Sequence, residues 1–69
     1  KAINYLNEII PDLKNWSNIS SFIPEHIKHY LEYKSAYASY FVASLELTKE
    51  GKILLKENVK NNLEIIRNN

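Results

Sequence analysis

The sequence predicts a small α+β domain, mainly helical, in which three helices precede a two-stranded β-hairpin. Two observations support this prediction. Apolar residues recur at helical spacing through most of the chain, and two short apolar segments near its end alternate like strands. The single glycine, Gly51, lies between these two parts, where the last helix would end. With 69 residues, the chain forms one domain at most, spanning residues 1–69.

The first helix is predicted from apolar residues at helical spacing, which are Ile3, Leu6, Ile9, Ile10 and Leu13. Pro11 has no backbone N–H and its ring clashes with the preceding turn, so this helix should end near Ile10. A linker over residues 12–15 leads to Trp16. We expect Trp16 to anchor the core, because a buried indole contributes a large apolar area.

A short second helix is expected from Ser17, a favourable N-cap residue, to Ile23, with Pro24 as its stop. The segment 25–31 could be a loop or the start of the third helix. His26 and His29 lie here at a spacing that shares one helical face, so a metal site is conceivable. We favour an exposed polar connector and predict no metal site.

The third helix is predicted over residues 33–47, closed by Gly51 as a left-handed cap. On a helical wheel its polar positions form one narrow wedge: Ser35, Ser39, Glu46 and Glu50. One apolar side carries Tyr33, Ala36, Tyr37, Tyr40, Ala43 and Leu47. The adjoining side carries Ala38, Phe41, Val42 and Leu45. Such a helix must be covered on more than one face, either by the rest of the chain or by another protein.

The hairpin is predicted from strands over residues 52–57 and 63–67, with Asn61-Asn62 suited to the turn. Alternation assigns four side chains to the covered face: Ile53, Leu55, Leu63 and Ile65. Leu54 and Ile66 then point to the opposite face. Exposed apolar residues on a two-stranded edge favour contact with a partner or aggregation.

Three helices followed by a hairpin is the element order of a winged-helix domain, in which the third helix often reads DNA. Here the exposed wedge carries Glu46 and Glu50, which would repel phosphates. Three wing lysines could still contact a phosphate backbone: Lys52, Lys56 and Lys60. DNA binding is therefore the alternative, and the surplus apolar surface favours protein docking.

The composition of the chain reduces the number of possible function classes. The net charge is +1, which is not typical of a strong nucleic-acid binder. The chain has no cysteine, so disulfides are excluded and a reducing, cytoplasmic setting is expected. No apolar run is long enough for a membrane span. We find no nucleophile–base pair, phosphate-binding glycine loop or metal cluster, and predict neither enzymatic activity nor a cofactor.

Two segments carry a family resemblance. The run from Trp16 to Pro24, and the block from Phe41 to Gly51 with the pattern Phe-x-Ala-x-Leu-Glu-Leu, resemble the C-terminal domain of segregation and condensation protein A (ScpA). ScpA proteins are the bacterial kleisins. The first residue is Lys rather than Met, and the resemblance implies that the chain is the C-terminal fragment of a longer protein.

The resemblance implies a winged helix that docks on the ATPase head of an SMC protein, with no catalysis of its own. It further implies that ScpB binds the missing part of the parent chain, that DNA is contacted only indirectly, and that the complex acts in chromosome condensation and segregation at the nucleoid. From the residues themselves, Leu54 and Ile66 are our first candidates for the docking contacts. Tyr40 and Leu47 follow, while we expect Phe41, Leu45 and Ala38 in the core.

Overall fold

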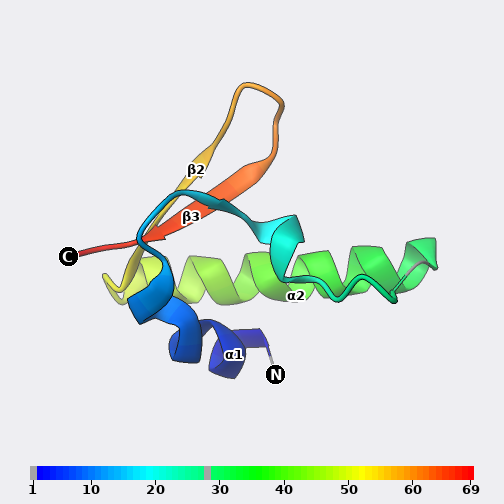
Figure 1. The fold of residues 1–69 in the computed structure, drawn as a ribbon, viewed down its shortest axis with the longest axis horizontal. Helices are drawn as coiled ribbons and strands as arrows, with labels where there is room; N and C mark the ends of the chain where they lie inside the picture. Colours follow the sequence, from blue (N-terminus) through cyan, green and yellow to red (C-terminus); the bar gives the residue numbers. More distant parts are fainter. Residues whose placement is uncertain (1, 28) are drawn as a thin grey trace.

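The computed structural model describes residues 2–27 and 29–69. In these residues, two α-helices pack with an antiparallel sheet of strand order β1-β3-β2 (Figure 1). The α+β class is confirmed. A winged helix with three helices is not confirmed, because the described part of the chain replaces the expected second helix by a strand and a short turn.

The first helix, α1, spans Ala2–Ile9 and is followed by a 3₁₀ turn, η1, at Ile10–Asp12. Pro11 therefore ends the α-helix within one residue of the predicted position. Leu6 is completely buried on the inner face of α1. The C-terminal strand fixes this end of α1, since the Arg67 guanidinium donates a hydrogen bond of 2.9 Å to the Pro11 carbonyl.

The prediction of a second helix from Ser17 to Ile23 is wrong. Ser17–Asn18 forms the short strand β1, which pairs antiparallel with β3 so that Ser17 lies opposite Ile65. A single 3₁₀ turn, η2, follows at Ile19–Phe22. It cannot lengthen because Pro24 holds Ile23 in the extended region (φ −82°, ψ 127°). The pairing with β3 satisfies backbone groups of β1 that a helix would otherwise have paired locally.

The long helix, α2, spans Tyr30–Lys49, so Tyr30 and Leu31, at the end of the segment left open above, belong to this helix. His29 is its extended N-cap residue, and its Nδ1 accepts a hydrogen bond of 3.3 Å from the Leu31 N–H. At the other end Gly51 has φ +78°. The Gly51 and Lys52 N–H groups donate to the Thr48 and Leu47 carbonyls, each at 3.0 Å, and close a Schellman motif. The predicted glycine cap is confirmed.

The hairpin is also confirmed, with β2 at Ile53–Glu57 and β3 at Leu63–Arg67. Asn61 takes the left-handed conformation in the connecting turn, at φ +64°. In Figure 1 the hairpin rises on one side of α2, whereas α1 lies on the other. A common core joins α1, α2 and the inner face of the sheet, formed by Leu6, Leu13, Ile19, Ala43, Leu47, Ile53 and Ile65.

Several core predictions are wrong. Trp16 is 38% exposed and Leu45 is 40% exposed, while Ala38 is exposed and Phe41 is only partly buried. The sheet and α1 cover the side of α2 that carries Ala43 and Leu47, so the adjoining apolar side of α2 stays outside. The predicted polar wedge is confirmed, since all of its members are exposed: Ser35, Ser39, Glu46 and Glu50.

Candidate docking surface

The outer face of the sheet carries two of the four predicted docking residues. Ile53 is buried at 1% exposure and Leu55 is partly buried, so the side chains between and beside them face outward. Leu54 is accordingly 45% exposed. It lies directly opposite Ile66 in the β2–β3 register, and Ile66 is half-buried. The two apolar side chains form one cross-strand pair, as alternation predicted.

Trp16 adds an aromatic side chain to the same face. It directly precedes β1, in which Ser17 lies opposite Ile65 of β3. The Lys56 amine lies 4.3 Å from the centroid of the indole ring. Lys56 is two residues beyond Leu54 in β2 and therefore shares its face. The outer-face patch therefore consists of Trp16, Ile66 and Leu54.

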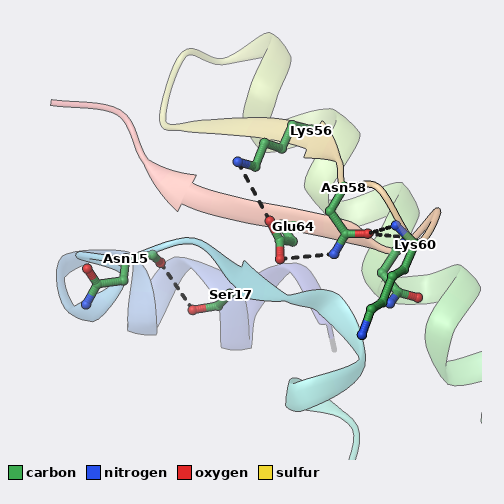
Figure 2. A network of polar contacts seen from close by, with 7 residues as sticks. Asn15, Ser17, Lys56, Asn58, Lys60 and Glu64 are labelled. Atoms are coloured by element: carbon green, nitrogen blue, oxygen red, sulfur yellow. Dashed lines mark hydrogen bonds and ion pairs between the residues drawn. The ribbon is translucent and has the colours of Figure 1, made fainter.

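Polar groups border the outer-face patch near the turn between β2 and β3. The Lys56 amine lies 3.9 Å from a carboxylate oxygen of Glu64, and the Asn58 amide donates a hydrogen bond of 3.2 Å to the other oxygen (Figure 2). Asn58 also organises the turn, because its Oδ1 accepts from the Lys60 and Asn62 N–H groups at 2.8 and 3.1 Å. The border is therefore held in place before any partner binds, which lowers the entropy cost of docking.

The lysines of the hairpin region, Lys52, Lys56 and Lys60, do not form an open basic strip. Lys52 pairs with Glu50 at 3.3 Å and also donates to the side-chain oxygen of Asn7 at 3.4 Å. Lys56 is held by Glu64 and by the Trp16 ring. Exposed ion pairs of this kind are weak, but each carboxylate reduces the positive potential that phosphates would meet. The arrangement therefore leaves little unpaired positive charge at Lys52 and Lys56.

The other two predicted docking residues lie elsewhere. Leu47 is completely buried at 0% exposure, so it belongs to the core and offers no surface to a partner. Tyr40 is partly buried in an aromatic cluster, with its ring centroid 6.2 Å from that of Tyr5 and 6.1 Å from that of Phe22. Burial raises the pKa of Tyr40 above 10.0, and Tyr5 adds to the shift. Leu47 is therefore a core residue and not a docking residue. Tyr40 lies at the edge of the core, away from the outer face of the sheet.

A second exposed apolar surface lies on α2. The α2 stripe consists of Ala38, Phe41, Val42 and Leu45. Val42 is 63% exposed and Leu45 is 40% exposed. Their spacing places all four on one side of the helix. The sequence grouped these residues correctly, but an almost uniformly apolar helix gives no signal of which side the rest of the chain will cover.

No group of three or more His, Asp or Glu residues in the described ranges is placed to hold a metal ion. His29 serves instead as the N-cap of α2, and His26 is exposed in the connector before it. Within those same ranges, neither α-helix combines the length and apolar character needed to cross a bilayer.

Comparison of the chain with models of known protein families, with characterised proteins and with solved structures gives no match.

Proposed function

We propose that this chain is a protein-docking domain that binds the ATPase head of an SMC protein, as the resemblance to the kleisin C-terminal domain implies. The observation that carries this proposal is the outer-face patch. Trp16, Ile66 and Leu54 form an apolar patch on the outer face of the sheet, beside an ordered polar border. Aromatic and aliphatic side chains of this kind dominate the binding energy of many protein interfaces.

The composition of the patch fits a docking site better than a chance exposure. Isolated apolar side chains are common on protein surfaces, but Leu54 and Ile66 are paired across strands and Trp16 lies on the same face of the sheet. Trp is among the residues most enriched at binding hot spots, and here Trp16 is 38% exposed. In the parent protein, the domain would join the SMC head to the ScpB-binding segments and would meet DNA only through the complex.

The alternative is a nucleic-acid-binding domain that uses Lys52, Lys56 and Lys60. One observation favours it: Lys60 lies at the tip of the wing, where its amine makes no ion pair with the described residues. The nearby carboxylates of Glu50 and Glu64 weigh against it. The two functions differ in their response to salt, because binding through lysines releases counterions and apolar docking does not.

The test is isothermal titration calorimetry of the chain against an SMC ATPase head, with duplex DNA as the second titrant. We expect saturable one-to-one binding to the head that changes less than about threefold between about 50 and 200 mM salt. We expect no heat of binding with DNA at the higher salt. If a folded SMC head gives no heat of binding, and DNA binding weakens steeply as the salt concentration rises, the proposal is rejected in favour of the alternative.

A further inference from the structure

We propose that the groove between α1, η2 and α2 binds an arginine side chain of a partner polypeptide. This aromatic groove has a volume of about 730 Å³ and opens to the surface, and Tyr5, Phe22 and Tyr40 all line it. None of its lining residues belongs to the outer-face patch, so the proposal does not depend on the function proposed above. Its rings, its charge and its hydrogen-bond acceptors each favour this ligand.

The three aromatic rings form a compact triangle. Their centroids lie 6.5 Å apart for Tyr5 and Phe22, 6.2 Å for Tyr5 and Tyr40, and 6.1 Å for Phe22 and Tyr40. A cation about 3.5 Å above the plane of the centroids would lie about 5 Å from each, within the range over which aromatic rings attract cations. The Tyr5 ring is inclined to the other two by 67° and 77°, so the rings do not form one flat stack. One cation can therefore contact all three rings.

The charge of the aromatic groove favours a cationic ligand. Among the described residues that line it, Glu25 is the one with a formal charge, and they include no lysine, arginine or histidine. A carboxylate at the edge of an open groove attracts a cation and repels an anion. Aromatic rings add to this preference because their faces carry partial negative charge. The groove therefore favours a positively charged group over a neutral or negative one.

The acceptor atoms of the aromatic groove favour a guanidinium among the cations. The phenol oxygens of Tyr5 and Tyr40 can accept hydrogen bonds. The Ser21 hydroxyl donates to the Asn18 carbonyl at 2.6 Å, which leaves its own lone pairs for an incoming donor. A guanidinium carries five N–H donors in one plane, stacks on aromatic rings and pairs with a carboxylate through two parallel bonds. An ammonium is a compact point charge, so arginine fits this set of groups better than lysine.

The open shape of the groove favours a side chain of a polypeptide over a free amino acid. Sites for small molecules usually enclose most of the ligand surface, whereas Tyr5, on the wall of this groove, is 44% exposed. Glu25 would also repel the carboxylate of free arginine. An arginine inside a polypeptide has no such carboxylate. We therefore assign the groove to an exposed arginine of a partner.

NMR titration with the capped peptide Gly-Gly-Arg-Gly-Gly tests the proposal, with the ring resonances of Tyr5, Phe22 and Tyr40 as the readout. We expect saturable shifts and a dissociation constant on the order of 10 mM, because a single side chain makes few contacts. The same peptide with citrulline, which has a neutral urea in place of the guanidinium, should bind at least about fivefold more weakly. Free arginine should bind at least about threefold more weakly than the arginine peptide.

Variants locate the contact. Tyr5→Leu removes one ring and should weaken binding of the arginine peptide about fivefold or more. Glu25→Gln removes the charge of an exposed side chain and should weaken binding about threefold or more. Tyr33→Leu is the matched control, because Tyr33 is 37% exposed and its ring packs 6.3 Å from that of Tyr37 on α2, outside the groove. It should bind the peptide like the wild type.

Several results would overturn the proposal. Equal binding of the arginine and citrulline peptides would show that the groove does not recognise charge. Tighter binding of free arginine than of the peptide would make the ligand a small molecule. Unchanged binding in Glu25→Gln and in a folded Tyr5→Leu, or lost binding in Tyr33→Leu, would place the contact elsewhere. Absence of any shift up to about 100 mM peptide would reject the site itself. None of these results bears on binding to the SMC head.

Discussion

Replacing Leu54 by Asp should separate docking from folding. Leu54 is 45% exposed on the outer face of β2, so a little over half of its side chain is already covered in the free chain. Full burial of a leucine contributes about 2 kcal/mol, and losing the covered half should therefore cost the fold about 1 kcal/mol. We expect Leu54→Asp to remain folded, with a circular dichroism spectrum like that of the wild type.

The effect on docking should be much larger. A partner that covers Leu54 would also cover the new carboxylate, which would lose its water without gaining a counter-charge. A desolvation penalty of about 3 kcal/mol corresponds to a loss of affinity of about 100-fold. Titration calorimetry of wild type and variant against the SMC head measures this difference directly.

Leu45→Asp is the matched control. Leu45 is 40% exposed, nearly the same as Leu54, and receives the same substitution on α2 instead of on the sheet. Its stability cost should be similar, and its affinity for the SMC head should stay within about threefold of the wild type. If Leu54→Asp binds as tightly as the wild type, or if Leu45→Asp loses affinity equally, the outer-face patch is not the docking site.

Three further predictions concern the fold. Leu47→Ala should lower the free energy of unfolding by about 2–5 kcal/mol in urea titrations, because Leu47 is completely buried; a loss below about 1 kcal/mol would contradict its place in the core. Gly51→Ala should cost about 1 kcal/mol, measured the same way, from the left-handed backbone alone, since an added Cβ would meet no atom within 4 Å; an unchanged stability would contradict the cap. The raised pKa of Tyr40 means that its stabilising effect is complete below pH 10.0 and is lost as the pH rises through the folded-state pKa. Tyr40→Phe should therefore lose stability less steeply than the wild type as the pH rises above 10, and an identical alkaline profile would argue against a raised pKa of Tyr40.

Features set by local backbone chemistry could be predicted from the sequence. Pro11 ends α1 through its own ring, Gly51 closes α2 through its own φ angle, and Asn61 turns the hairpin in the same way. Alternation in β2 was enough to place Leu54 on the outer face. Each of these outcomes depends on a few neighbouring residues, which the sequence displays directly.

Features set by distant parts of the chain could not be predicted. Ser17 is a good helix N-cap, but it pairs with Ile65, and no local pattern signals that partner. Trp16, which directly precedes this strand, is partly exposed on the outer face of the sheet, whereas the sequence predicted it in the core. The side of α2 that faces the core could not be predicted either, because apolar residues occupy most of the circumference of this helix. In the structure the sheet packs on the side that carries Leu47.

The most direct test of the central claim uses Trp16, the single tryptophan of the chain, as a reporter of the outer-face patch. Fluorotryptophan would be incorporated at this position and followed by fluorine NMR during titration with the SMC ATPase head. If the patch is the docking site, the resonance should shift or broaden and reach saturation at one head per chain. An unchanged resonance, while calorimetry reports binding, would contradict the account and place the contact on another surface.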